Sequence, residues 1–379
     1  MKSAMTSSVI KTWLLPRLVF IPYHATKFVL AVVGTICRAK RKKIYARAPH
    51  LALEAGIGGW NLIEYKELYN TACEYLGSAN VSRIVIDRNA NYLRQVLSLP
   101  NKDTVTHYFY DPRTGSQSWI GGFWQSLRIA LFLQQNDIVP IAALTDFPMR
   151  RWRMQSAMVT ARRGVVVSIM SQKEVGHIFP HKRVVGPCLV PFSVKTERVV
   201  DSLIAHRADG SPPRAIFAGS LYEPRTTELR IVSEEVRARG GVFEILGRGI
   251  GTERISDEAY WARLCNAEIV FTTASQMTQK GCDLQHLPHL IYRYLEVLAC
   301  GNLLVAPEVP GIRRYFTPGR DFVAFDTLEH AAEKIHQYLN DASGRLEIAR
   351  NGKARATALI GARTYWLTVD IGLGADSMT

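Results

Sequence analysis

The stretch from Pro288 to Phe325, PHLIYRYLEVLACGNLLVAPEVPGIRRYFTPGRDFVAF, constrains the fold of this chain most. Its first third reads as a helix, because proline suits the first turn of a helix and Gly301 suits the residue just past the end. Apolar side chains recur there at helical spacing and predict a buried stripe. They are Leu290, Ile291, Tyr294, Leu295 and Leu298. The stripe leaves His289, Arg293 and Glu296 together on the opposite, polar face.

A strand and a loop follow this helix. The apolar run from Leu303 to Ala306 predicts a buried strand, and Pro307, Pro310 and Gly311 then form a loop before a further helical turn. Helix, strand and loop in this order make half of a βαβ unit. In open α/β sheets ligands bind outside the carboxyl ends of the strands. We therefore expect Glu296 and the loop that contains Gly311 to border a cleft.

The same residues resemble a known family. Arg293, Glu296, Ala299 and Gly301, followed by LLVAPEVPG, are similar to the signature of the C-terminal domain of bacterial GT-B glycosyltransferases of the family 1/4-like branch. In that family the glutamate holds the ribose hydroxyls of a nucleotide-sugar, and an ionised carboxylate can accept from two vicinal hydroxyls at once. Retaining members often carry a second glutamate eight positions earlier, where this sequence has Pro288. The resemblance therefore leaves open whether the reaction retains or inverts.

Length and pattern predict two domains. A chain of 379 residues exceeds what one hydrophobic core usually supports. Strand and helix patterns alternate along it, which favours an α/β fold. We expect a GT-B-like fold of two Rossmann-like domains whose parallel sheets face each other across a cleft. The predicted parts are an apolar and basic N-terminal segment at 1–48, an acceptor-side domain at 49–200, a linker at 201–213 and a nucleotide-sugar-binding domain at 214–379.

The net charge of +14 and the pI near 9.6 indicate an anionic partner. Composition alone does not choose among a nucleic acid, a membrane surface and a phosphorylated substrate. Six cysteines are scattered without a C-x-x-C pair, which argues against structural zinc and against a disulfide framework. A reducing cytoplasm is the simplest setting.

The N-terminal segment has the composition of a peripheral membrane anchor. The residues from Val9 to Cys37 are largely apolar, but charges and prolines interrupt them, so a membrane-spanning helix is not expected. The run from Phe28 to Cys37 is followed at once by the basic cluster from Arg38 to Lys43. An apolar anchor with a polybasic patch predicts binding at the inner face of the plasma membrane. An ordinary packed helix and a signal peptide are the alternatives, although a signal peptide carries its charges before the apolar run.

Candidate catalytic residues lie in the N-terminal half. Asp146 follows a predicted strand at 137–144, where an α/β domain places chemistry, and the basic, aromatic turn from Arg150 to Arg153 comes next. We predict Asp146 as the general base, with His107 and Asp111 as further candidates. The alternative is that Asp146 caps a helix and that the arginines are solvated.

Candidate donor-binding residues lie in the C-terminal half. A predicted strand runs into Gly219 and Ser220 and then into a helix, which places free backbone N–H groups and the Arg225 guanidinium where a diphosphate could sit. An exposed arginine at a helix start is the alternative. The GT-B resemblance extends over residues 214–370 and implies a basic residue at this position. Lys280 and Arg293 are further candidates to stabilise the leaving diphosphate.

The resemblance implies a glycosyltransferase that moves a sugar from a nucleotide-sugar donor to a cell-surface glycan or lipid-linked acceptor, as in lipopolysaccharide synthesis. It implies no cofactor and no bound metal, and the sequence contains no D-x-D pattern. A non-catalytic GT-B-like scaffold and a nucleic-acid-binding protein remain alternatives. An NAD-dependent oxidoreductase is disfavoured, because no G-x-G-x-x-G fingerprint precedes an acid at the required distance.

Overall fold

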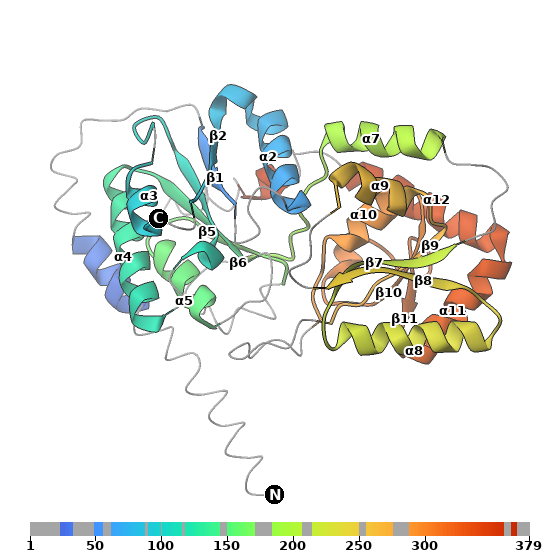
Figure 1. The fold of residues 1–379 in the computed structure, drawn as a ribbon. Helices are drawn as coiled ribbons and strands as arrows, with labels where there is room; N and C mark the ends of the chain where they lie inside the picture. Colours follow the sequence, from blue (N-terminus) through green and yellow to red (C-terminus); the bar gives the residue numbers. More distant parts are fainter. Residues whose placement is uncertain are drawn as a thin grey trace, which may run out of the picture. The chain divides into compact units, whose positions relative to one another are not determined.

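The computed structural model describes residues 23–32, 49–55, 62–87, 90–99, 101–115, 118–144, 150–170, 184–206, 214–249, 255–275, 288–359 and 365–369. The chain forms two compact units (Figure 1). Unit 1 comprises Met1–Cys188 and Ala362–Thr379, and unit 2 comprises Leu189–Gly361. Each unit is a parallel α/β structure, as the sequence predicts.

Unit 1 is built on a six-stranded sheet in the order β2-β1-β3-β4-β5-β6, in which every described pair is parallel. The strands are β1 (Leu51–Glu54), β2 (Val81–Ile84), β3 (His107–Tyr110), β4 (Val139–Leu144), β5 (Val165–Ser168) and β6 (Val184–Val185). Four of them read as buried apolar runs, which is the pattern of a sheet covered on both faces.

The helices of unit 1 follow the strands in alternation. They are α2 (Ile63–Leu76), α3 (Tyr92–Leu97), α4 (Trp119–Gln135) and α5 (Arg150–Val159), with the short 3-10 turns η2 (Ser78–Asn80) and η3 (Pro112–Thr114). Ser118 caps α4 by accepting from the Gly121 backbone N–H at 3.0 Å, which explains why this helix begins at Trp119. Helical segments at 23–32 and 365–369 complete the unit.

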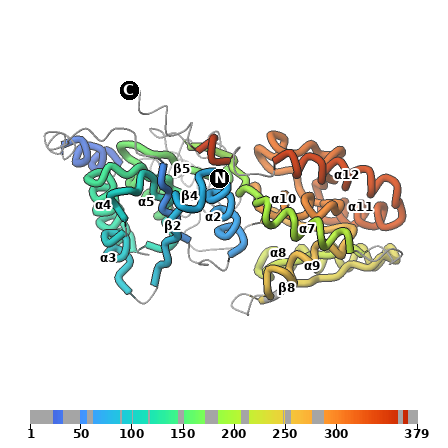
Figure 2. The backbone as a smooth tube through the Cα atoms, turned by 90° about the horizontal axis from the view of Figure 1, so that it is seen from above, coloured from blue at the N-terminus to red at the C-terminus, as the bar shows by residue number. Residues whose placement is uncertain are grey.

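Unit 2 has a five-stranded parallel sheet in the order β11-β10-β9-β7-β8. Its strands are β7 (Ala215–Leu221), β8 (Phe243–Gly249), β9 (Ile269–Phe271), β10 (Leu303–Pro307) and β11 (Val323–Phe325). The helices are α7 (Val194–Ala205), α8 (Arg225–Ala238), α9 (Asp257–Cys265), α10 (Arg293–Ala299), α11 (Leu328–Asn340) and α12 (Ala342–Leu359), with η4 at Ile312–Arg314. Helices α11 and α12 lie side by side (Figure 2).

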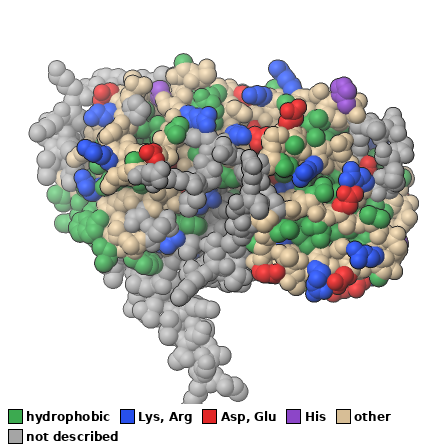
Figure 3. All heavy atoms as spheres, viewed as in Figure 1, with side chains coloured by type: hydrophobic (Ala, Val, Ile, Leu, Met, Phe, Trp, Pro, Cys, Tyr) green, Lys and Arg blue, Asp and Glu red, His purple; other side chains and the backbone are tan. Residues whose placement is uncertain are grey.

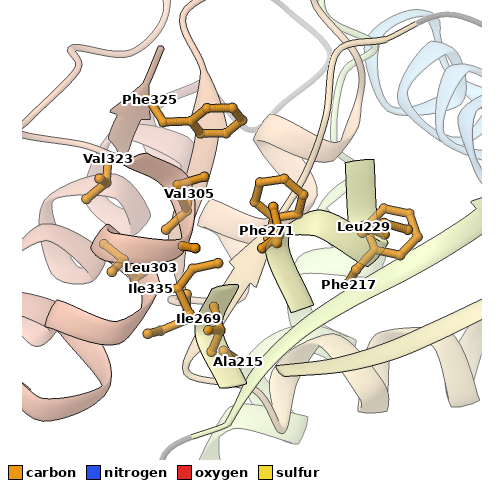
Figure 4. Packing of buried hydrophobic residues seen from close by; sticks show 14 of the residues in the cluster. Ala215, Phe217, Leu229, Ile269, Phe271, Leu303, Val305, Val323, Phe325 and Ile335 are labelled. Carbon is orange, nitrogen blue, oxygen red and sulfur yellow. The ribbon is translucent and has the colours of Figure 1, made fainter. Parts of the chain in front are cut away.

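The core of unit 2 lies between the sheet and helices α8 and α11 (Figure 4). Phe271 of β9 is fully buried and stacks on Phe325 at 5.4 Å between ring centroids, while Phe243 meets its edge at 5.9 Å. Offset and edge-to-face aromatic pairs add to the stabilisation from burial alone. This packing fixes the strands whose carboxyl ends carry the candidate site.

The compact units differ from the domain limits predicted at 49–200, 201–213 and 214–379. Helix α7 begins at Val194 and packs against α9 of unit 2, so the chain enters unit 2 before the predicted linker. The C-terminal segment packs on unit 1 instead, where Trp366 Nε1 donates to Thr71 Oγ1 at 3.2 Å and the indole meets Phe109 edge-on. Long-range packing of this kind leaves no signal in local sequence pattern.

Candidate functional site

The carboxyl ends of β7, β9 and β10 meet at one edge of the unit 2 sheet, because these strands are parallel neighbours. Two of the loops that follow them are held together by hydrogen bonds. The Tyr222 hydroxyl, after β7, donates to the Ser275 carbonyl, after β9, at 3.4 Å. The Ser275 hydroxyl in turn donates to Glu228 of α8. Segments far apart in the sequence are thereby brought to one edge of the sheet.

Arg225 is held in a fixed position at this edge. It is the first residue of α8, and its Nη1 donates to the Ser220 carbonyl at 3.2 Å while its Nε donates to Thr273 Oγ1 at 3.3 Å. The guanidinium carbon lies 4.2 Å from the centroid of the Tyr222 ring, within cation–π range. The structure therefore places a positioned guanidinium, not a fully solvated one, beside the N-terminus of a helix, where an anion is favoured.

His289 lies buried beside Arg225, with 5% of its surface exposed. Burial, with the positive charge of Arg225 as a second cause, lowers the pKa of His289 from 6.5 to about 4, so the ring is neutral at pH 7. Within the described residues, no group hydrogen-bonds to its Nδ1. A buried polar atom without a partner is uncommon in proteins and is a natural contact for a ligand.

The helix that carries His289 in the sequence prediction begins later in the structure. Helix α10 starts at Arg293, and its first backbone bond accepts at Ile291, so Pro288 and His289 precede the helix. The prediction of a helix from Pro288 is therefore wrong, whereas its end is confirmed, because Gly301 has the left-handed φ of +69° that suits glycine there.

Arg293 and Glu296 form an ion pair one turn apart on α10, with Nε 3.3 Å from Oε2. The Arg293 guanidinium also lies over the Tyr260 ring at 5.2 Å. A Cβ on Gly219 would lie 3.4 Å from Arg293 Nη2 and 3.1 Å from the Phe217 ring, so glycine allows this guanidinium to approach the β7 backbone. Gly219 and Arg293 are thus brought together as predicted partners in a site.

Glu296 is less open than the sequence predicts. Its side chain is 6% exposed, against 17% for Arg293, because the short helix α10 is covered by α12 and β10 and its residues from Tyr294 onward are all buried. The expected open polar face is therefore absent from α10. The Glu296 carboxylate is compensated by Arg293, and its contact with a ribose stays a prediction.

Gly311 lies in the loop after β10, at the same edge. Its φ of +81° is left-handed, which explains the glycine at the start of η4. The Tyr294 hydroxyl donates to the Pro307 carbonyl at 2.5 Å and ties α10 to this loop. Lys280, the remaining donor-side candidate, lies outside the described residues.

Of the catalytic candidates of unit 1, the two that the structure describes lie apart. Asp146 lies outside the described residues. His107 is the first residue of β3, and Asp111 directly follows the last residue of this strand. Their backbones therefore lie about 13 Å apart, at opposite ends of the strand. His107 Nδ1 lies 2.9 Å from Thr106 Oγ1. The two residues therefore cannot serve as alternative bases at one reacting atom.

Asp111 is fully buried and ion-paired. It accepts from Arg113 Nη2 at 2.8 Å and from the Tyr65 hydroxyl, and it caps η3 through the Arg113 backbone N–H at 2.8 Å. These contacts hold α2 and η3 together. The carboxylate therefore has a structural role, and its role as a base stays a prediction.

A second buried carboxylate, Glu54, ends β1 at the carboxyl edge of the same sheet. It accepts from the hydroxyls of Tyr92 (2.9 Å to Oε2), Tyr108 and Thr114. Burial raises the pKa of Glu54 to about 8; the three hydrogen bonds oppose this shift, and the nearby charge of Asp111 adds to it. Glu54 of β1 thereby joins α3, which follows β2, to the neighbouring strand β3 and to η3, which follows β3.

Comparison with known proteins identifies the fold. Residues 225–361 match a family model described as glycosyl transferase-like. HepE of Anabaena, solved with UDP and glucose, is 10% identical with a TM-score of 0.57, over 86% of this chain and 100% of that one. A glycosyltransferase from Rickettsia africae is 11% identical with a TM-score of 0.57, over 88% and 99%. Sucrose-phosphate synthase from Thermosynechococcus elongatus is 13% identical with a TM-score of 0.54, over 86% and 98%. No curated protein matches the sequence.

The chain has the GT-B glycosyltransferase fold. In this GT-B protein the match to the family model begins at Arg225 and contains His289, Arg293, Glu296 and Gly311. The predicted fold class is therefore confirmed, and the donor-side candidates lie in or next to the matched region.

Sequence reasoning missed several side chains of the GT-B site. Thr273 and Tyr222 fix Arg225, and Tyr260 faces Arg293. Thr273 could have been found by the rule that selected Asp146, since it also follows the end of a strand. Tyr260 lies on α9 with no local signal of its contact. In the part of the chain that the structure describes, no group of three His, Cys, Asp or Glu side chains is arranged to hold a metal ion.

Proposed function

We propose that this protein is a glycosyltransferase that transfers a sugar from a nucleotide-sugar donor, held by unit 2, to a cell-surface glycan or lipid-linked acceptor. The observation that carries the proposal is the fixed guanidinium of Arg225 at the N-terminus of α8, beside the neutral and buried His289. The match of residues 225–361 to a glycosyl transferase-like family supports it, as does the UDP bound by HepE.

The chemistry of this edge suits a diphosphate. Two guanidinium groups, Arg225 and Arg293, are positioned by side-chain contacts before any ligand binds, so they need little reorganisation as charge develops. The Nδ1 atom of His289 offers a further polar contact, and neutral imidazole can donate or accept there. A planar guanidinium with several donors matches phosphate oxygens better than a single ammonium does.

In the proposed reaction an acceptor oxygen forms the new bond to the anomeric carbon of the sugar. The bond from that carbon to the diphosphate breaks, and its electron pair leaves with the nucleoside diphosphate. Arg225 and Arg293 offset the charge that collects on the leaving group. A base, for which Asp146 is the candidate, takes the acceptor proton. Because the two guanidinium groups assist the departure of the diphosphate, the proposed reaction does not require a bound metal ion.

The acceptor and the place of action are proposed from the sequence. The basic and apolar segment at 1–48 supports work at the cytoplasmic face of a membrane, where lipid-linked acceptors are found. No helix among the described residues is long and apolar enough to cross a bilayer.

Calorimetric titration of the full chain with UDP, GDP, dTDP and CMP tests the donor site. We expect one nucleotide to bind, and Arg225→Gln to weaken its binding about tenfold or more, since a hydrogen bond to a charged group contributes about 1.5–3 kcal/mol. Arg230→Gln is the matched control, because it removes the same charge from an exposed position of the same helix, where Arg230 pairs with Glu234. Its affinity should stay within about twofold of the wild type.

The outcomes separate the alternatives. Equal affinity in both variants, or binding of none of the nucleotides, refutes the donor site. Nucleotide binding without sugar transfer to membrane extract, across a panel of nucleotide-sugars, indicates the non-catalytic scaffold. Tight binding of an oligonucleotide that competes with the nucleotide indicates a nucleic-acid-binding protein.

A further inference from the structure

Helix α4 exposes large apolar side chains near its N-terminus, which is unusual for a surface helix. Its sequence, WIGGFWQSLRIALFLQQ, contains a single charged residue, Arg128. The polar side chains of Gln125 and Ser126 are buried, whereas Trp119 is 45%, Ile120 76% and Trp124 58% exposed. Large apolar side chains on the exposed side of a helix are a reason to expect a contact surface there.

The helix at 23–32 extends this apolar surface. Its inward residues Tyr23, Thr26 and Leu30 are buried at helical spacing. It is fixed to unit 1 because the Leu30 carbonyl accepts from Gln134 Nε2 of α4 at 2.7 Å and from Arg162 Nη1 at 3.0 Å. Its outward side chains include Phe28, which is 71% exposed, together with Val29 and Val32. Figures 1 and 2 both draw this helix, in blue, next to α4.

We call this surface the apolar face, and it consists of Phe28, Val29, Val32, Trp119, Ile120 and Trp124. Hydrophobic side chains gather at the left edge of Figure 3, over the region where Figure 1 draws the two helices. Seven large hydrophobic side chains of unit 1 are strongly exposed among the described residues, and six of them belong to this face. Single exposed apolar side chains are ordinary, but several that gather on two helices joined by a hydrogen bond mark a contact surface.

The charge of the chain indicates which partner covers this face. The first 53 residues contain ten Lys or Arg and no Asp or Glu, so they supply most of the net charge of +14. Lys27 and Arg128 are exposed on the two helices of the apolar face. Five basic residues between Arg38 and Lys43 follow Val32 closely in the sequence. Tryptophan favours the level of the lipid headgroups, and each nearby basic residue adds about 1 kcal/mol on an anionic leaflet.

We propose that the apolar face docks on an anionic lipid bilayer, with Trp119, Trp124 and Phe28 inserted at headgroup depth, and that the positive charge of the chain favours an anionic leaflet. This inference rests on the proposed peripheral membrane association and assigns it to particular side chains on folded helices. It places α4 of unit 1 against the membrane, in addition to the N-terminal segment. A second copy of the chain or a partner protein would cover the same face without requiring anionic lipid.

The test is flotation of the full chain with vesicles. One set contains about 30% phosphatidylglycerol in phosphatidylcholine, which provides the anionic surface, and the other contains phosphatidylcholine alone. We expect binding to the anionic set, weakened by salt, and quenching of tryptophan fluorescence by lipids brominated near the headgroup. The double variant Trp119→Ser/Trp124→Ser should lower the partition coefficient about tenfold or more, since burying one large apolar side chain contributes about 1.5–3 kcal/mol.

A matched control removes two exposed apolar side chains from unit 2. Val242→Ser/Leu346→Ser changes residues that are 68% and 57% exposed, and its vesicle binding should equal that of the wild type. Nucleotide binding by calorimetry should be unchanged in both double variants, which shows that each is folded and tests the donor site separately.

Each remaining outcome contradicts the proposal at a different level. Wild-type protein that does not float with anionic vesicles refutes peripheral association itself, whatever the nucleotide titration shows. Equal binding of the wild type and the tryptophan variant refutes the apolar face as the contact and leaves the basic segment alone. A tryptophan variant that changes from dimer to monomer, with unaltered flotation, assigns the face to a second copy of the chain.

Discussion

Replacing Glu54 by glutamine should make the stability of the protein less dependent on pH. Glu54 is fully buried at the end of β1, and its carboxyl accepts hydroxyl hydrogen bonds from α3, β3 and η3 through Tyr92, Tyr108 and Thr114. Burial is the main cause that raises the pKa of Glu54 from 4.5 to about 8. The folded protein therefore holds a proton on this residue at neutral pH, whereas the unfolded chain does not.

The sign and size follow from proton linkage. Between pH 4.5 and 8 the folded state binds more protons at this site than the unfolded state, so the free energy of unfolding falls as the pH rises. A shift of this size, at 1.36 kcal/mol for each pKa unit, corresponds to about 3 to 5 kcal/mol lost by pH 9. Glutamine has the shape of the neutral acid but does not ionise. Glu54→Gln should match the wild type near pH 5 to within about 1 kcal/mol and exceed its stability above pH 8.

Urea unfolding at a series of pH values, followed by circular dichroism, measures this effect. Subtracting the two profiles cancels every titrating group that the wild type and the variant share. Glu74→Gln, at an exposed position of α2 in the same unit, is the matched control and should run parallel to the wild type. If the Glu54→Gln profile also runs parallel from pH 4.5 to 8, the carboxyl is ionised in the folded protein and the reasoning is wrong.

Three further substitutions probe the two units. Phe271→Ala should lower the free energy of unfolding by about 3–5 kcal/mol in urea, because it leaves a cavity in the unit 2 core, and a loss below 1 kcal/mol would contradict that packing. Asp111→Asn should cost roughly 3 kcal/mol by leaving Arg113 without its carboxylate, and undiminished stability would show that this ion pair does not stabilise the fold. In wild-type protein, the free energy of unfolding measured in urea should fall by about 3 kcal/mol at acid pH because of His289, and His289→Gln should remove this fall. The pKa of His289 falls from 6.5 to about 4, so wild-type stability declines below pH 6.5, and an unchanged profile would mean that the histidine titrates normally.

Much of the fold could be predicted because local pattern and tertiary packing agree. The strand predicted at 137–144 is found as β4 at Val139–Leu144. The apolar run at Leu303–Pro307 and the left-handed Gly301 are also read correctly. Such elements are specified within one or two turns of chain. Strand order and the convergence of Arg225, Thr273 and Arg293 depend on contacts across many residues, which a single sequence does not report.

The failures of prediction have physical causes in particular residues. Pro288 suits a helix start, but α10 begins only at Arg293, and His289 is buried next to Arg225. Glu54 gives no signal in an apolar run, because one polar residue at a strand end usually lies in solvent. Its three hydroxyl partners come from separate segments, so only the folded chain shows that the carboxyl is satisfied.

Unit 1 departs from the ordinary arrangement of polar and apolar side chains at two places. Glu54 places a carboxyl in the interior, although apolar packing at such sites is often as stable or more stable. The apolar face places Trp119 and Trp124 in solvent, although burial would stabilise them. Real proteins depart from local consistency mainly where function requires it. The buried Glu54 holds segments together at the carboxyl edge of the sheet, where α/β proteins bind ligands. The exposed tryptophans give α4 a surface that can contact a partner. The two can be separated by experiment, because changing Glu54 should alter pH-dependent stability without altering vesicle binding, whereas changing the two tryptophans should do the opposite.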